Sequence, residues 1–159
     1  MRPVSFLLAI LALCALAGVI PFSAGELSRV IPAELLVVSA ADGGVLVQVD
    51  SGTAAWGADV PEALETLSRA APGSLLLSTV DRLVFCGLLP EAEELLDCGL
   101  RPAAAVFLSP EPEDPEALRK YLRNVGGVTL GILADAPQTP LPRLIQGQSG
   151  LYLDEEWLS

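Results

Sequence analysis

The hydrophobic pattern of residues 33–50 predicts a β-hairpin. The apolar run AELLVVS (33–39) is separated from the run VLVQVD (45–50) by an Asp-Gly-Gly sequence at 42–44. In the second run valine occupies every other position, so one face of the strand is apolar while the other becomes more polar along the chain. Two such runs around an Asp-Gly-Gly turn are typical of antiparallel strands that are joined tightly.

Residues 59–73 carry the signals of an amphipathic helix. Asp59 is followed by an early proline and then by Glu62, which is the order of an N-cap residue and the acid of a capping box. The Pro-Gly pair at 72–73 ends the helix. The apolar residues at helical spacing are Val60, Ala63, Leu64, Leu67 and Ala71. Residues 51–57, which precede this helix, are predicted to form a loop.

Strands and helices alternate through the rest of the chain. Residues 74–86 predict either one long strand or two short strands bent near Thr79. The elements expected next are a helix at 90–98, a strand at 103–109, a helix at 115–124, a strand at 128–133, a Pro-rich extended segment at 135–142 and a last strand within 151–159. This order predicts an α/β (α+β) fold with a mixed sheet of about five to six strands and about three helices.

An uncharged apolar segment, residues 4–22, precedes this domain. Its 19 residues fit either a signal peptide or a membrane-spanning helix, and Arg2 before it agrees with a positive-inside orientation. Small residues allow cleavage after Ala24, but the bulky Phe22 stands where signal peptidase needs a small residue, which favours a retained anchor. Both alternatives place the rest of the chain outside the cytoplasm, either at the outer face of the cell membrane or secreted.

Three parts of the chain follow from this pattern. Residues 1–24 are a signal peptide or membrane anchor, residues 29–134 an extracytoplasmic α/β domain, and residues 135–159 a Pro-rich tail with a last strand. Within the first part, Cys14 ends the sequence LALC, which resembles a lipobox. Leu13 stands where a lipobox has Gly, Ala or Ser, so a small apolar residue in a membrane helix is favoured over lipidation at Cys14.

The charge balance excludes several classes of function. Nine Lys and Arg face twenty Asp and Glu, giving a formal charge of −11, which argues against binding to nucleic acid and offers no polybasic patch for anionic lipid. Histidine is absent, which removes the commonest general base and the commonest zinc ligand. Lys120 is the single lysine, so a Ser-Lys catalytic dyad is nearly excluded as well. No catalytic residue, metal ligand or cofactor is therefore predicted.

Two cysteines remain in the exported part. Export favours a disulfide between Cys86 and Cys98, but Cys86 is predicted to end a strand and Cys98 the helix that returns along it. Nine helical residues descend roughly 12 Å at about 1.5 Å each. A disulfide needs Cα atoms within about 7 Å of each other, so two free thiols are expected.

Four carboxylates, Asp42, Asp50, Asp59 and Asp81, are candidates for an acid–base pair or a cation site. Asp42 suits a turn and Asp59 a helix cap, and no calcium-loop spacing is present. Asp81 beside Arg82 in an apolar run is the most unusual; because neighbours on a strand point to opposite faces, the two need not pair. A solvent-facing strand position is favoured over a site. An enzyme would need Asp50 and Asp81 to converge, and their spacing gives no reason to expect it.

The positions of glycine and tryptophan give only weak indications of a binding site or an interface. No G-x-G-x-x-G or Walker sequence is present, and G-Q-S-G at 147–150 lacks the strand-to-helix setting of a nucleophile elbow. Trp56 in the predicted loop and Trp157 near the end of the chain are candidate interface anchors. Burial of either indole in a local pocket is an equally good interpretation.

Residues 29–124 contain a series of short words that resemble one family. The words are RVIPAELL (29–36), VLVQV (45–49), Gly-Thr (52–53), EALETLSRAAPG (62–73) and LLLSTVDRLVFCG (75–87). Together they are similar to the N-terminal domain of the C subunit of nutrient-germinant receptors in endospore-forming bacteria. In that family a strand pair precedes the helix that holds the L-S-R word, and a strand, a short helix and another strand follow.

This resemblance implies a protein that is not an enzyme. Members of the family are held on the outer face of the membrane and act with integral-membrane subunits in sensing germinants. The matching positions are structural, so no ligand-contacting residue is carried over. We therefore expect a membrane-anchored extracytoplasmic domain that acts through protein–protein interaction in germination or sporulation. The alternative is a secreted α/β module that binds a small ligand or has a structural role.

Overall fold

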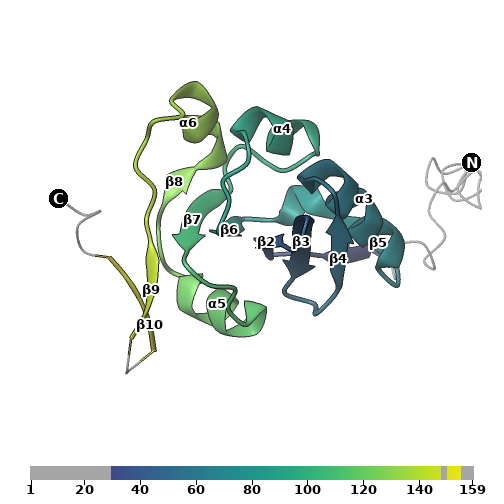
Figure 1. Ribbon diagram of the computed structural model, residues 1–159, viewed down its shortest axis with the longest axis horizontal. Helices are drawn as coiled ribbons and strands as arrows, with labels where there is room; N and C mark the ends of the chain where they lie inside the picture. Colours follow the sequence, from purple (N-terminus) through teal and green to yellow (C-terminus); the bar gives the residue numbers. More distant parts are fainter. Residues whose placement is uncertain (1–29, 148–149, 155–159) are drawn as a thin grey trace, which may run out of the picture. The chain divides into compact units, whose positions relative to one another are not determined.

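The computed structural model describes residues 30–147 and 150–154. The predicted α/β fold is confirmed: a six-stranded mixed sheet packs with four helices in the described part, one more than expected (Figure 1). The strands are β1 (Val30–Pro32), β2 (Leu35–Ala41), β3 (Gly44–Val49), β4 (Ala54–Gly57), β5 (Ser74–Leu76), β6 (Arg82–Cys86), β7 (Ala105–Ser109), β8 (Val128–Thr129), β9 (Leu144–Gly147) and β10 (Gly150–Leu153). The helices are α3 (Val60–Ala70), α4 (Ala92–Asp97), α5 (Pro115–Leu122) and α6 (Leu130–Asp135).

The main sheet has the strand order β4-β3-β2-β6-β7-β8. Its three central strands, β2, β6 and β7, run parallel, while β3, β4 and β8 pair antiparallel. The chain first moves outward from β2 to β4 and then returns to place β6, β7 and β8 on the other side of β2. The strand order thus reverses between β2 and β6, and the carboxyl ends of β2, β6 and β7 lie along one edge of the sheet.

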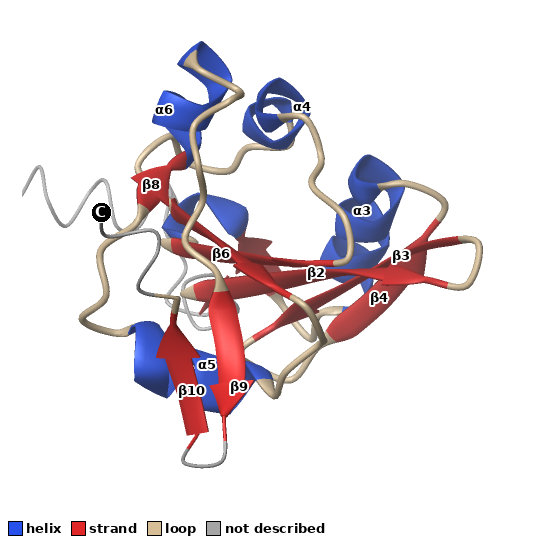
Figure 2. Cartoon of the chain, turned by 60° about the vertical axis from the view of Figure 1, so that its left-hand side comes forward, coloured by secondary structure: helices blue, strands red, loops and turns tan. Residues whose placement is uncertain are grey.

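The helices cover both faces of this sheet. Helices α3, α4 and α6 lie on one face and α5 lies on the other (Figure 2). Alternate residues of β6 enter the two cores: Phe85 joins the first and Val84 the second. Helix α5 contributes Leu118 and Leu122 to the second core, and both are fully buried.

The first hairpin forms as its pattern predicts. Strands β2 and β3 pair antiparallel with Val38 opposite Val47, and Gly43 takes the left-handed conformation of the turn, with φ of +77°. The alternating valines of β3 are buried and its other side chains are half-buried. The hydrophobic alternation was therefore sufficient to fix this pairing.

Helix α3 begins with the predicted cap. The Asp59 carboxylate accepts a hydrogen bond from the Glu62 amide at 2.9 Å, and the Glu62 carboxylate accepts one from the Ala58 amide at 2.8 Å. These bonds satisfy amide groups that the first helical turn leaves without partners. Helix α3 passes so close to β4 that a Cβ on Gly57 would overlap the backbone of Ala63.

The run 74–86 divides at Thr79, which confirms the second of the two alternatives. Strand β5 is followed by a 3-10 turn (Leu77–Thr79) before β6 begins. The Thr79 hydroxyl donates to the Leu76 carbonyl at 2.7 Å and accepts from the Ala33 amide at 3.1 Å. This side chain replaces the backbone pairing that a continuous strand would have made.

The prediction that residues 51–57 form a loop is wrong in part, because residues 54–57 form β4. The sequence AAWG lacks the β-branched alternation of a strand, and its extended conformation depends on pairing with β3, where Leu46 lies opposite Trp56. Tertiary pairing therefore overrides a weak local preference at the edge of the sheet.

The strand predicted at 128–133 is also mostly wrong. Only β8 is extended, and the chain then forms α6. The Thr129 hydroxyl accepts from the Ile132 amide at 3.4 Å as an N-cap, and the Leu130 amide donates to the Ala104 carbonyl at 2.8 Å. These bonds, together with burial of Leu130 and Leu133 on one helical face, favour the helix.

The Pro-rich tail adds a second hairpin, β9–β10. Residues 151–153 form a strand as predicted, whereas the sequence pattern does not predict β9, and 155–159 lie outside the described residues. The Leu108 amide donates to the Pro142 carbonyl at 2.9 Å, which brings this segment beside the carboxyl end of β7. Leu144 is buried in the second core. No helix in the described part is long and apolar enough to span a membrane, and residues 4–22 lie outside that part.

Candidate functional site

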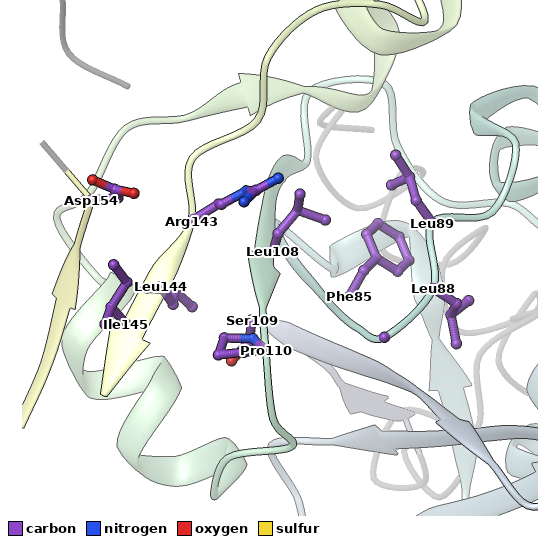
Figure 3. Close-up of a pocket in the computed structure, with 11 residues that line it drawn as sticks. Phe85, Leu88, Leu89, Leu108, Ser109, Pro110, Arg143, Leu144, Ile145 and Asp154 are labelled. Carbon is purple, nitrogen blue, oxygen red and sulfur yellow. The ribbon is translucent and has the colours of Figure 1, made fainter. Parts of the chain in front are cut away.

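A cavity of about 510 Å³ opens at the carboxyl ends of β6 and β7, against β9 (Figure 3). This is the edge of a parallel sheet at which α/β proteins bind ligands. The residues that line it are Phe85, Gly87, Leu88, Leu89, Leu108, Ser109, Pro110, Arg143, Leu144, Ile145 and Asp154. Most of these side chains are apolar, so the cavity suits a largely apolar occupant.

Three segments that are distant in sequence build the walls. After β6 the chain turns at Gly87, whose φ of +74° favours glycine, and this turn presents Leu88 and Leu89 to the cavity. Pro110 stops β7 directly after Ser109. The third wall comes from β9 and the residue before it (Figure 3).

Arg143 is the one basic side chain among the lining residues. Its guanidinium, just before β9, extends toward Leu108 rather than toward Asp154 (Figure 3). Asp154 directly follows the neighbouring strand β10, and its amide donates to the Arg143 carbonyl at 2.9 Å. Within the described residues the ion pairs involve Arg69, Arg82 and Arg119, and none involves Arg143. The cavity therefore combines apolar walls with one positive charge at its mouth.

A row of three buried polar side chains lies beside the cavity. Ser39, Cys86 and Ser109 stand directly opposite one another on β2, β6 and β7. Burial raises the pKa of the Cys86 thiol above its ordinary value of 9.0, although a hydrogen bond with Ser39 opposes the rise. The Ser109 hydroxyl donates to the Glu111 carbonyl at 2.8 Å. Cys86 is thus a protonated thiol and a poor nucleophile.

The expectation of two free thiols is confirmed. Cys86 is buried, Cys98 is half-buried, and neither forms a disulfide. Burial is also the main cause that raises the pKa of Cys98, and the nearby Glu94 carboxylate adds to it.

Asp50 and Asp81, the candidates for a catalytic pair, lie at the opposite, amino-terminal edge of the parallel strands. The Asp50 side chain, only 5% exposed, lies 3.4 Å from Nη1 of Arg119 and accepts from the Glu34 amide at 3.3 Å. Asp81 pairs with its neighbour Arg82 at 2.9 Å, so the two do pair, because Asp81 precedes the strand rather than lying within it. The cavity beside Asp81 measures only about 50 Å³. Each carboxylate is thus engaged by an arginine in a structural network.

The other candidate residues fall in different places. Asp42 is exposed in the hairpin turn, and Asp59 caps α3. Trp56 lies on the edge strand β4 and is 50% exposed; it also covers Gly44, where an added Cβ would come within 2.6 Å of the indole. Gly147 ends β9 and Gly150 begins β10, so G-Q-S-G spans a hairpin turn. Cys14 and Trp157 lie outside the described residues.

Sequence reasoning did not identify the residues of the cavity. Arg143 is the single charge in the apolar, proline-rich stretch 137–145, and this isolation was the one available signal. Its neighbours in space, around Leu88 and Leu108, come from segments whose proximity only the folded chain reveals.

Comparison with known proteins adds no relative. No protein-family model, no curated protein and no solved structure matches the chain. Within the described residues, no group of three or more Cys, Asp or Glu side chains could hold a metal ion.

Proposed function

We propose that this chain is a non-enzymatic extracytoplasmic domain, held at the membrane by residues 4–22, that acts through contact with integral-membrane receptor subunits in spore germination or sporulation. The proposal starts from the resemblance of residues 29–124 to the N-terminal domain of germinant-receptor C subunits. The observation that carries it is the order of elements. The strand pair β2–β3 and the short strand β4 precede the helix with the L-S-R word. After it come β5, the strand β6 with its glycine turn, a short helix and another strand, an order that agrees with the family apart from the short strands β4 and β5.

The shared words fall at positions that determine local structure. Gly52 has a φ of +85° in the turn between β3 and β4, and its amide donates to the Val49 carbonyl at 2.9 Å. The Val49 amide in turn donates to the Thr53 carbonyl at 3.0 Å. The Gly-Thr word thus closes a tight turn, and the resemblance speaks for a shared architecture and for no particular ligand.

The edge of the sheet offers a surface for a protein partner. Strand β4 is the outermost strand on its side, so its outer backbone groups have no partner within the six-stranded sheet. Trp56 projects from this strand and is half exposed. An exposed tryptophan on an open sheet edge is typical of interface anchors and of partners that add a strand.

The arrangement of reactive groups supports a role without catalysis. Asp50 and Asp81 are engaged by arginines, and the buried Cys86 thiol is held protonated. The cavity beside Asp81 measures only about 50 Å³, which is too small for a substrate.

The test is isolation of the tagged full-length chain, in mild detergent, from membranes of sporulating cells that encode it. We expect integral-membrane receptor subunits to co-purify with the wild-type chain and to be lost with Trp56→Ala. Tyr152→Ala is the matched control, because Tyr152 is also exposed and also covers a glycine, Gly147, on another hairpin. Retention of the same subunits by Trp56→Ala would contradict the proposed interface.

The alternative function, a secreted module that binds a small ligand, is favoured by one observation, the apolar cavity beside Arg143. Mass spectrometry of the isolated chain distinguishes the two functions. A chain that keeps residues 1–24, or carries lipid on Cys14, supports the membrane-held protein. A chain that begins at Gly25 and is recovered alone from the medium supports the secreted module.

A further inference from the structure

We infer that the cavity at the carboxyl ends of β6 and β7 binds a small amphipathic carboxylate, whose apolar body lies against Leu89 and Leu108 and whose anionic group pairs with Arg143. This inference goes beyond the proposed function. It concerns a different surface from β4 and is independent of whether the chain remains at the membrane.

The dimensions and lining of the cavity define the apolar part of the ligand. Its volume of about 510 Å³ lies within the roughly 300–1,000 Å³ of small-molecule sites. Leu89 at the rim is 47% exposed, and Leu88 and Leu108 beside it are partly exposed. An apolar chain that covers these side chains removes their surface and its own from water, which is favourable.

Arg143 defines the charged part of the ligand. The chain carries a formal charge of −11, so its overall field repels anions, and a cation at the mouth of an apolar cavity is the exception to that field. The guanidinium forms no ion pair within the described residues, unlike Arg69, Arg82 and Arg119. A planar guanidinium matches a carboxylate with two parallel hydrogen bonds.

The single basic side chain limits the charge of the ligand to one. Arg143 is the one basic residue of the lining, and its guanidinium points toward Leu108 (Figure 3). A second negative charge on the ligand would find no second cation among the lining residues. This favours a monocarboxylate over a diphosphate or a dicarboxylic acid.

The position of the cavity in the fold supports a binding role. It lies outside the carboxyl ends of two neighbouring parallel strands, β6 and β7. Loops after parallel strands present side chains at this edge without disturbing the sheet.

The experiment is equilibrium dialysis of labelled hexanoate, octanoate and decanoate against the full-length chain in mild detergent, with matched micelles as the blank. Each added methylene is expected to tighten binding about fourfold, since a buried CH₂ contributes about 0.8 kcal/mol. Octanol, which has the same chain and no charge, is expected to bind about tenfold more weakly than octanoate, because a hydrogen bond to a charged group contributes about 1.5 kcal/mol or more.

Two pairs of variants locate the site. Arg143→Gln is expected to weaken octanoate binding about tenfold, and Arg101→Gln, an exposed arginine outside the cavity, to leave it unchanged. Leu89→Asp, which places a negative charge at the rim, is expected to abolish binding. Ile132→Asp is its control, because Ile132 is 51% exposed on α6 and does not line the cavity.

Several results would overturn the inference. They are absence of saturable octanoate binding, equal binding of octanol, or unchanged binding by Arg143→Gln. Binding that appears only after residues 155–159 are deleted would also overturn it, because the occupant would then be the chain's own terminal segment. Octanoate binding tests the cavity, and co-purification of membrane subunits tests the proposed function. A negative result in one measurement therefore does not decide the other.

Discussion

The Nε of Arg82, at the start of β6, donates a hydrogen bond of 2.9 Å to the carbonyl oxygen of Leu122, the last residue of α5. Nη2 of the same guanidinium donates to the Arg123 carbonyl at 3.0 Å. An arginine from the sheet thus caps the carboxyl end of a helix that begins more than thirty residues later in the chain. This contact explains why an Asp-Arg pair interrupts an otherwise apolar run.

Removal of this cap is expected to destabilise the fold. Arg82→Met keeps the length of the side chain but leaves the carbonyls of the last turn of α5 without their donor, and the Arg82 side chain is only 20% exposed. We expect the free energy of unfolding to fall by about 2 kcal/mol. Urea denaturation of the full-length chain, followed by circular dichroism, measures it.

The control for Arg82 is Arg69→Met. Arg69 pairs with Glu65 on the surface of α3, and both side chains are largely exposed. Its loss is expected to change the stability by less than about 0.5 kcal/mol. Equal destabilisation by the two variants would show that the contacts of Arg82 with α5 contribute nothing of their own.

Substitution of Gly57, on the edge strand β4, is expected to destabilise the fold strongly. A Cβ at this position would overlap the backbone of Ala63, so Gly57→Ala would push α3 away from β4. We expect a loss of about 3 kcal/mol in the free energy of unfolding. Gly126→Ala is the matched control, because an added Cβ there meets nothing within 4 Å. Thermal melts of both variants decide the matter, and a wild-type midpoint for Gly57→Ala would show that α3 has room to move.

Stability is expected to decrease at alkaline pH because of Cys86. Burial raises the pKa of its thiol in the folded chain above 9.0, its ordinary value. The folded state therefore holds the proton more tightly than the unfolded state. The resulting stability is fully present below pH 9 and is lost as the pH rises through the folded pKa.

Urea denaturation between pH 7.5 and 10.5 measures this dependence. Cys86→Ser is expected to flatten the profile on the alkaline side, and Cys98→Ser to do so less, because Cys98 is only half-buried. Wild-type and Cys86→Ser profiles that run parallel would contradict the assignment. Iodoacetamide should also modify Cys98 before Cys86 in the folded chain.

The elements that sequence patterns predicted correctly are those whose local signals agree. The first hairpin combines valine alternation with an Asp-Gly-Gly turn, and α3 combines an Asp59 cap with helical spacing. In both segments, residues close in the chain supply the bonds that define the element. The apolar pattern and the residues of the turn or cap then predict the same element.

The elements that were missed depend on distant partners. Strand β4 is short and rich in alanine, and it is extended because β3 offers it a pairing edge. Helix α6 occupies a stretch with strand-like residues, and its first amides are satisfied by Ala104 and Pro102. The cavity follows the same rule, since Phe85, Leu108 and Arg143 meet only after the sheet has formed and the tail has folded back on β7.

The central claim is that the β4 edge contacts an integral-membrane partner, and site-specific photo-crosslinking tests it most directly. A benzophenone amino acid would replace Trp56 in one chain and Tyr152 in another, and both chains would be irradiated in membranes of sporulating cells. We predict that position 56 forms a covalent adduct with an integral-membrane receptor subunit and that position 152 does not. Equal adducts at the two positions, or an adduct at neither, would contradict the proposed function.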